Sequence, residues 1–195
     1  MSCHISPAAR RLSGFTLIEL MVTIAIAAIL LMIGVPSFVA FQRNSELTSA
    51  TNSLVAAINA AKGEAMKRGL SAVVVPRDGT DWVSGWRVFV DRNGNQLFDP
   101  GSDIAVTQQE GLASYFGASG TGTAAGGAPY IMFDPSGYTK TAGAGFGALT
   151  ISIARNDISG TELAEQTRRI VVAASGRVRA CRPAVDSTCT ASATE

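Results

Sequence analysis

Glu19 is the residue of this sequence that most clearly calls for a chemical explanation, because it is the single charge in an apolar run. Between Phe15 and Val35 the chain has no other charged residue. A helix of that length would span about 30 Å, the thickness of the hydrocarbon core of a bilayer. A carboxylate at that depth costs about 2.5 to 3.5 kcal/mol on insertion scales. The sequence therefore predicts a membrane-spanning helix in which Glu19 is functional and needs a partner.

A cluster of arginines near the carboxyl terminus is the second chemical feature. Fifteen consecutive residues without any acid contain Arg168, Arg169, Arg177, Arg179 and Arg182, although the formal net charge of the chain is only +1. Such segregation produces a local positive field. If residues 177–179 are extended, two of the guanidinium groups project to one side about 6 to 7 Å apart and could contact successive phosphates of a nucleic acid. The alternative is a solvated edge strand whose charges prevent unwanted pairing.

Oxygen-bearing side chains between Asp91 and Asp99 are spaced like the first half of a calcium loop. The sixth position of such a loop should be glycine but is Gln96, and the twelfth should be a bidentate acid but is Ser102. A tight hairpin turn that uses Asn and Gly is the favoured interpretation, and calcium remains the alternative.

The residues around Glu19 resemble a known processing signal. The segment Gly14-Phe15-Thr16-Leu17-Ile18-Glu19 is similar to the class III signal of type IV pilins and type II secretion pseudopilins. The resemblance implies that a prepilin peptidase cuts after Gly14 and methylates Phe15. It also implies that Glu19, the fifth mature residue, pairs with the terminal amine of a neighbouring subunit during assembly. An ordinary secretory signal, the alternative, would be cut after its apolar region.

Processing at Gly14 would change which residues are available for chemistry. The leader, residues 1–14, contains Cys3 and the only histidine, His4. We expect Cys181 and Cys189 to form a disulfide in an oxidising compartment, because no histidine or further cysteine pair remains to complete a zinc site. The mature chain cannot build a Ser-His-Asp, Cys-His or His-metal arrangement. We predict that the protein is not an enzyme and has no catalytic residues, metal or cofactor.

A long helix and short strands should position these residues. Proline at position 36 lacks an amide hydrogen, so we expect a kink or local loosening there, after which the helix resumes. The apolar positions then step by three and four, as on one face of an amphipathic helix: Leu47, Thr51, Leu54, Ile58, Ala61 and Ala65. Gly69 should end this helix.

Beyond Gly69 the pattern is typical of short strands separated by turns. The candidate strands are 72–75, 85–90, 104–107, 130–133, 148–154 and 169–174, and residues 117–129 should form a mobile loop. The predicted fold class is α+β: a long N-terminal transmembrane and amphipathic helix packed on a mainly antiparallel β-sheet domain, as in pilins. The expected segments are the leader 1–14, transmembrane helix 15–35, amphipathic continuation 36–69, β-rich domain 70–182 and tail 183–195.

The arginine cluster also carries a family resemblance. The segment Gly176-Arg177-Val178-Arg179 resembles the Gly-Arg-x-Arg motif of FimT-type minor pilins, which bind extracellular DNA for natural transformation. The resemblance implies that Arg177 and Arg179 contact DNA, that Arg182 assists, and that Cys181 and Cys189 brace the tail. The whole mature chain is compatible with the GspH/FimT family.

The sequence thus predicts a noncatalytic minor pilin or pseudopilin. Its expected partners are other pilins or pseudopilins, the prepilin peptidase, the inner membrane and double-stranded DNA. Arg10 and Arg11 precede the apolar run and favour a cytoplasmic amino terminus, which leaves the globular domain in the periplasm before assembly into a fibre. The alternative function is a GspH-like minor pseudopilin that primes the pseudopilus of a type II protein secretion system.

Overall fold

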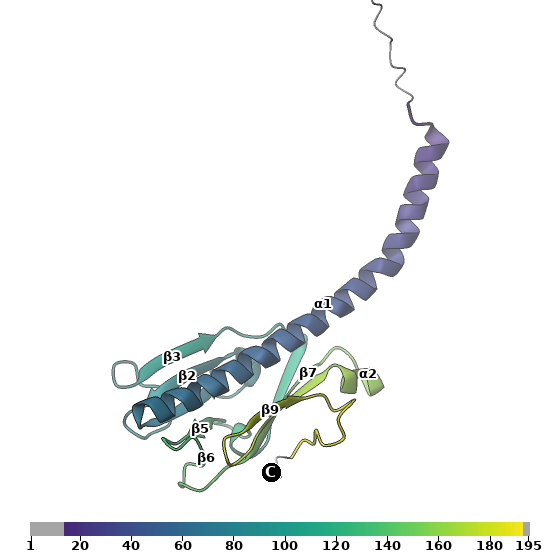
Figure 1. Ribbon diagram of the computed structural model, residues 1–195. Helices are drawn as coiled ribbons and strands as arrows, with labels where there is room; N and C mark the ends of the chain where they lie inside the picture. The colour runs from purple at the N-terminus through teal and green to yellow at the C-terminus, as the bar shows by residue number, and fades with distance from the viewer. Residues whose placement is uncertain (1–13, 193–195) are drawn as a thin grey trace, which may run out of the picture. The chain divides into compact units, whose positions relative to one another are not determined.

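The computed structural model describes residues 14–192 of the chain (Figure 1). The predicted leader therefore lies outside the described residues except for Gly14. The chain divides into two compact units, which meet between Gln42 and Arg43. A single helix, α1, runs from Leu17 to Arg68 through both units. The helix is continuous through Pro36, so the loosening expected there does not interrupt it.

The amino-terminal unit contains the predicted membrane segment. The helix is long and apolar enough to cross a membrane, and none of the residues in its most apolar 18-residue window is buried. Large apolar side chains such as Ile18, Leu31 and Phe38 are exposed on it. Exposure of so many apolar side chains is unfavourable in water and normal in a lipid environment.

The carboxyl-terminal unit combines the rest of α1 with two antiparallel sheets, as predicted. The first sheet has the strand order β3-β2-β1-β5-β6 and the second has the order β4-β7-β8-β9. The strands are β1 (Ser71–Pro76), β2 (Trp86–Asp91), β3 (Ile104–Gln109), β4 (Phe116–Gly120), β5 (Ile131–Phe133), β6 (Thr139–Lys140), β7 (Leu149–Arg155), β8 (Thr167–Val172) and β9 (Val178–Cys181). The short helices are η1 (Trp82–Ser84), η2 (Gly122–Ala124) and α2 (Gly160–Glu165).

Each of the six strand regions predicted from the sequence contains a strand. The prediction of a mobile loop at 117–129 was wrong in part. Residues 117–120 belong to β4, which pairs with β7 from Phe116↔Arg155 to Gly120↔Ile151. Gly120 lies so close to the backbone of Ala124 that a Cβ atom would meet its carbonyl oxygen at 1.9 Å. Gly120 is therefore required by close backbone packing, and its presence does not indicate a flexible segment.

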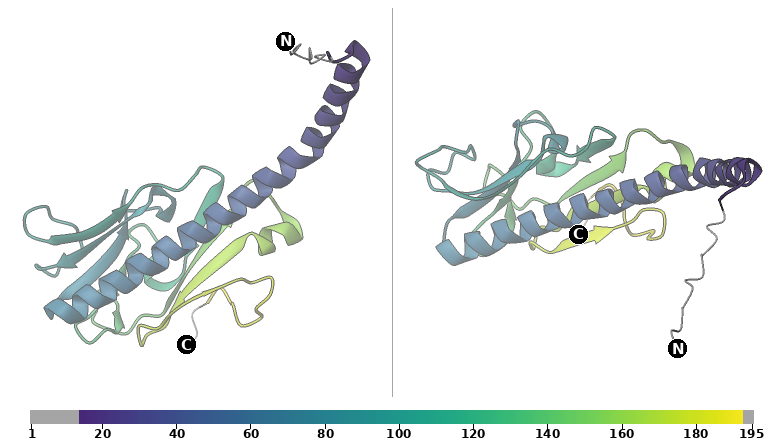
Figure 2. Two further views of the ribbon diagram at one scale, coloured as in Figure 1. Left: turned by 45° about the horizontal axis from the view of Figure 1, so that its top comes forward. Right: turned by 90° about the horizontal axis from the view of Figure 1, so that it is seen from above.

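One apolar core joins α1 to both sheets. All six residues of the predicted helical stripe are buried, and all of them except Thr51 pack with buried residues of both sheets, including Trp86 and Ile151. Figures 1 and 2 show this part of α1 lying against the strands. Full burial of a Leu or Ile side chain stabilises a fold by about 1.5 to 3 kcal/mol, so the stripe accounts for the attachment of the helix.

A polar network reinforces the start of this attachment. Arg155, which is 6% exposed, donates from Nε and Nη2 to the two carboxylate oxygens of Asp157 at 2.9 and 2.7 Å. Asp157 also pairs with Arg43 of α1, whose guanidinium lies 4.6 Å from the centroid of the Tyr115 ring. The hydrogen bonds from Arg155 hold the pKa of Asp157 below its usual value. The network therefore ties α1 to the end of β7.

Candidate functional site

Glu19 lies in the first turn of α1, where its backbone N–H donates to Thr16 Oγ1 at 3.3 Å. The threonine thus acts as a local cap for one of the unpaired amides at the helix start. A negative charge is favourable at this end of a helix because the helix dipole is positive there. Gly14 and Phe15 precede the helix and are exposed, so the predicted processing site is accessible.

The arginine cluster lies on β8, β9 and the segments that follow them. β8 pairs with β9 from Arg169↔Cys181 to Val172↔Val178, which makes β9 the outer strand of the second sheet. Arg177 directly precedes β9 and is exposed, and Arg182 directly follows it and is also exposed. The edge strand, which was the alternative to a nucleic-acid contact, is therefore present and is framed by two exposed cations.

Arg179 is less exposed than Arg177 and Arg182, and residues of the tail hold its guanidinium. Its Nη1 lies 3.3 Å from Asp186 Oδ2 and 3.0 Å from Thr188 Oγ1, and its Nη2 donates to the Thr188 carbonyl oxygen at 3.2 Å. The side chain retains 31% of its exposure. Asp186 in turn accepts from the Thr188 amide and hydroxyl at 2.9 and 2.6 Å. Arg179 therefore braces the tail in this structure.

The disulfide expected from the sequence is confirmed and closes this tail. The bond joins Cys181 to Cys189, whose Cα atoms are 5.8 Å apart. Cys189 is only 3% exposed, and its carbonyl oxygen accepts a hydrogen bond from Arg169. Residues 182–189 therefore form a loop fixed against β8 and β9.

Gly176 of the Gly-Arg-x-Arg segment has a structural reason to be glycine. Its φ angle is +75°, and a Cβ atom would meet the Gly137 carbonyl oxygen at 1.9 Å. Its own carbonyl oxygen accepts a hydrogen bond from Lys62 Nζ of α1 at 2.9 Å. A side chain would require both strained φ and backbone movement, so this glycine fixes the turn that presents Arg177.

Arg168 is the functional candidate whose burial the sequence did not reveal. It is 8% exposed and donates only to neutral oxygens: Nη1 to the carbonyls of Glu165 and Thr167 at 2.8 and 3.1 Å, and Nη2 to Asn44 Oδ1 at 2.7 Å. Burial, and then the positive charge of Arg182, lower the pKa of Arg168 from its ordinary value. The alternating pattern of β8 predicts only that one of two adjacent arginines points inward.

The segment with calcium-like spacing uses its carboxylates internally. Asp91, 3% exposed, accepts from the amides of Gly94 and Gln96 at 2.7 and 2.8 Å. Asp99 accepts from the side-chain amides of Asn93 and Asn95, each at 2.7 Å. No group of three or more His, Cys, Asp or Glu side chains suited to a metal occurs in residues 14–192. The connection is a loop between β2 and β3 rather than the tight turn favoured from the sequence.

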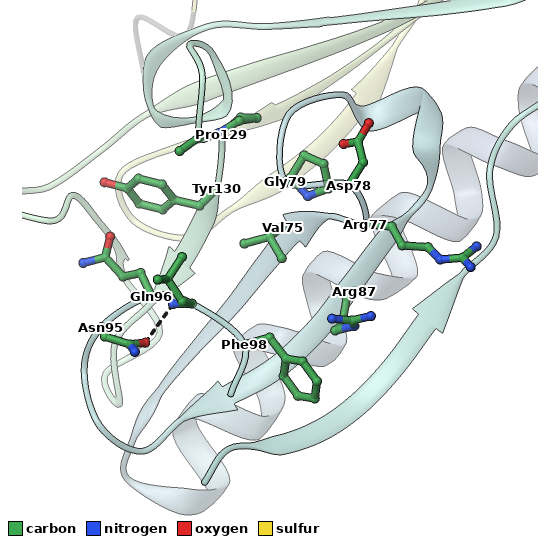
Figure 3. Close-up of a pocket in the computed structure, with 13 residues that line it drawn as sticks. Val75, Arg77, Asp78, Gly79, Arg87, Asn95, Gln96, Phe98, Pro129 and Tyr130 are labelled. Carbon is green, nitrogen blue, oxygen red and sulfur yellow. Dashed lines mark hydrogen bonds between the residues drawn. The ribbon is translucent and has the colours of Figure 1, made fainter. Parts of the chain in front are cut away.

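A cavity of about 530 Å³ lies on the outer face of the first sheet and was not predicted (Figure 3). Val75, Phe98 and Tyr130 supply apolar walls. Its arginines have partners: Arg77 pairs with Glu110, and Arg87 lies 4.5 Å from the centroid of the Phe98 ring. No signal in the sequence identifies this cavity, because its walls come from four separated segments.

Two family models match the chain. The model described as type II transport protein GspH matches residues 50–176, and the prokaryotic N-terminal methylation motif matches residues 9–35. The chain belongs to the GspH family. Members of this class are minor pilin or pseudopilin subunits of type IV pili or type II secretion, and they assemble with other pilins. The match ends at Gly176, so Arg177, Arg179 and Arg182 lie beyond it.

Individual relatives agree with this family assignment. The pilin-like protein PilA1 of Thermus thermophilus is 30% identical over 125 residues, which are 64% of this chain and 77% of that protein. The crystal structure of the type IV minor pilin FimU of Pseudomonas aeruginosa superposes with a TM-score of 0.51 at 20% identity, over 71% of this chain and 90% of FimU. The latter likeness establishes the pilin-like fold.

Proposed function

We propose that this GspH-family subunit is noncatalytic and is built into a type IV pilus-like fibre through the amino-terminal part of α1. The observation that carries the proposal is an exposed, membrane-length apolar helix segment with Glu19 as its single acid. Prepilin peptidase would cut after Gly14 and methylate Phe15. The new amine of a neighbouring subunit would then compensate the charge of Glu19 in the membrane. The globular unit would face the periplasm before assembly.

Processing and assembly can be tested in cells that contain the prepilin peptidase. Mass spectrometry should find a mature amino terminus at methylated Phe15. Replacement Glu19→Ala should lower the amount of the protein in sheared fibres at least tenfold, while Glu19→Asp retains the charge and serves as the matched control. Equal incorporation of wild type and Glu19→Ala would refute the proposed role of this acid, and an intact leader would refute the processing step.

A DNA-binding role of the same subunit is the finer part of the proposal. Its support is the exposure of Arg177 and Arg182 on either side of the edge strand β9, in a stretch without acids. Arginine contacts to phosphates give affinity that falls steeply with salt and reads little base sequence. Arg179, which was expected to touch DNA directly, would contribute mainly by bracing the tail through Asp186 and Thr188.

DNA binding can be measured with the full mature chain in alkyl maltoside micelles at several salt concentrations. We expect Arg177→Gln to weaken binding at least fivefold and to reduce the slope of log affinity against log salt by about 0.9, the value for one phosphate contact. Arg92→Gln removes an exposed charge from the loop that follows β2 and is the matched control. Absence of binding by the wild type at low salt would favour the second candidate function.

That second candidate is a minor pseudopilin that primes the pseudopilus of a type II secretion system. The description of the matching family as a type II transport protein favours it. Deletion of the chain should then abolish secretion of folded proteins and leave DNA uptake unchanged, whereas the first candidate predicts the reverse.

A further inference from the structure

Two guanidinium groups converge on one backbone oxygen between α2 and β8. Arg168 Nη1 donates to the Glu165 carbonyl oxygen at 2.8 Å, and Arg182 Nη2 lies 3.4 Å from the same atom. Two like charges are therefore held close together, although their repulsion opposes this arrangement. Among the described residues, no carboxylate forms an ion pair with either arginine.

Arg168 also has donors that the described residues do not use. An arginine carries five N–H donors, and three hydrogen bonds from Arg168 are present: two from Nη1 and one from Nη2. One hydrogen on Nη2 and the hydrogen on Nε remain. Buried arginines are normally paired with an acid, so a buried arginine that has only neutral acceptors and retains two donors is well suited to an external anion.

Both arginines line a cavity of about 400 Å³ between α1 and the disulfide-closed tail. Thr48 and Asn52 of α1 also line it, and Cys181 and Val185 contribute apolar surface. The hydroxyl hydrogen of Thr48 is already used, because it is donated to the Asn44 carbonyl oxygen at 3.0 Å. The side-chain amide of Asn52 is the further donor that α1 contributes to the cavity. The cavity thus has donors from α1, from β8 and from the segment after β9.

One acid also lines the cavity, but its oxygens are already engaged. Asp186 accepts from Thr188 through Oδ1 and lies 3.3 Å from Arg179 Nη1 through Oδ2. Arg179 therefore compensates the charge of Asp186, and this acid does not neutralise Arg168 and Arg182. The cavity keeps an excess of positive charge.

We propose that this cavity binds an oxyanion of the phosphate class through Arg168 and Arg182, with Asn52 as an additional donor. A phosphate presents oxygens in several directions, which fits donors from different walls better than a planar carboxylate does. Planar guanidinium groups bind such oxygens with charge-assisted hydrogen bonds. The phosphate could be inorganic or a phosphodiester of DNA, and only the second source rests on the DNA-binding role proposed above.

Inorganic phosphate titrated into the full mature chain in alkyl maltoside micelles tests the site, at constant ionic strength set with chloride. The Nε–H resonances of labelled arginines report which guanidinium groups bind. We expect saturable shifts of the Arg168 and Arg182 resonances. Arg182→Gln should weaken the affinity at least tenfold, and Arg168→Lys should do the same because lysine keeps the charge but lacks the planar fork.

Arg92→Gln is the matched control, because it removes one exposed positive charge from the loop after β2; its phosphate affinity should equal that of the wild type. Unchanged Arg168 and Arg182 resonances up to high phosphate concentration would overturn the inference. So would equal weakening by Arg92→Gln and Arg182→Gln, because this would indicate nonspecific charge. The amide spectra of all variants serve to confirm that each is folded.

A short duplex DNA forms the second arm of the experiment. Shifts of the same two resonances by DNA, reversed by inorganic phosphate, would assign the cavity to a DNA phosphodiester. If phosphate binds but DNA does not, the site stands with inorganic phosphate as its ligand, and the DNA-binding role fails. If DNA binds without shifting Arg168 and Arg182, the DNA-binding role stands and the cavity is not its site.

Discussion

The acidic loop between β2 and β3 and the arginine-rich segment around β9 behave in opposite ways. Both are clusters of like charge in the sequence, and each suggests a ligand. In the acidic loop, Asp91 and Asp99 accept hydrogen bonds from amides of the same loop. In the arginine segment, Arg168 has unused donors and Arg182 is exposed. Charge clustering therefore identifies a binding site only when the fold leaves part of the charge unsatisfied.

Chain geometry explains part of the difference. Backbone amides are abundant in a turn, and short Asp and Asn side chains reach them within two to five residues, so acids in a loop readily satisfy themselves. Arginine has no acceptor and needs oxygens at a distance. Arg179 finds them on Asp186 and Thr188 because the disulfide closes the tail, whereas Arg168 finds only neutral oxygens.

The largest effect expected from this comparison is at Asp91. Asp91→Ala would remove a buried carboxylate and leave the partly buried amides of Gly94 and Gln96 without their acceptor, and we expect it to lower the free energy of unfolding by about 3 kcal/mol. Denaturant unfolding in micelles can be followed by tryptophan fluorescence, because Trp82 and Trp86 are both buried in the globular unit. An effect below about 1 kcal/mol would contradict the structural role of this carboxylate.

Calcium provides the corresponding control on the wild type. A site with the affinity of extracellular calcium modules would stabilise the protein by at least about 1.4 kcal/mol at about 10 mM calcium. We expect no shift of the unfolding midpoint between calcium and chelator. A stabilisation of that size would show that the loop binds an ion and that the comparison drawn above is wrong.

The disulfide is expected to have the next largest effect. Replacing Cys181 and Cys189 together by alanine removes the closure of a short loop, which should cost about 2.5 kcal/mol in the chain-entropy model. Reduction of the wild type gives an independent measurement of the same change. If both measurements show an effect near zero, the tail is held by the contacts of Arg169 and Arg179 and the disulfide is not its main constraint.

Long patterns in the sequence predicted most of the fold, and short ones did not. The helical stripe from Leu47 to Ala65 repeats over several turns, and every predicted member is buried. β6 has only two residues and β4 is rich in small residues, so pairing with their neighbours decides their conformation and propensity does not. The same limit applies to the site: the arginine cluster is visible in the sequence, but the burial of Arg168 depends on packing against Asn44 of α1.

The smallest expected effect is on the pKa of Asp186. This pKa tests whether hydrogen bonds within the tail hold the carboxylate in place. The hydroxyl and amide of Thr188, followed by the charge of Arg179, hold the pKa of Asp186 below its usual value. An acid with a depressed pKa in the fold stabilises the protein above its unfolded pKa, and this contribution disappears as the pH falls through the folded pKa.

Thr188→Val should therefore raise the pKa of Asp186 toward its ordinary value, and carboxyl carbon resonances measured between about pH 2 and pH 6 would report the change. Asp99, whose pKa is lowered by hydrogen bonds from Asn93 and Asn95, is the internal reference and should not move. If Thr188→Val leaves the pKa of Asp186 unchanged, the tail does not hold this acid as described. Arg179 would then have a weaker anchor and would be more available to an external anion.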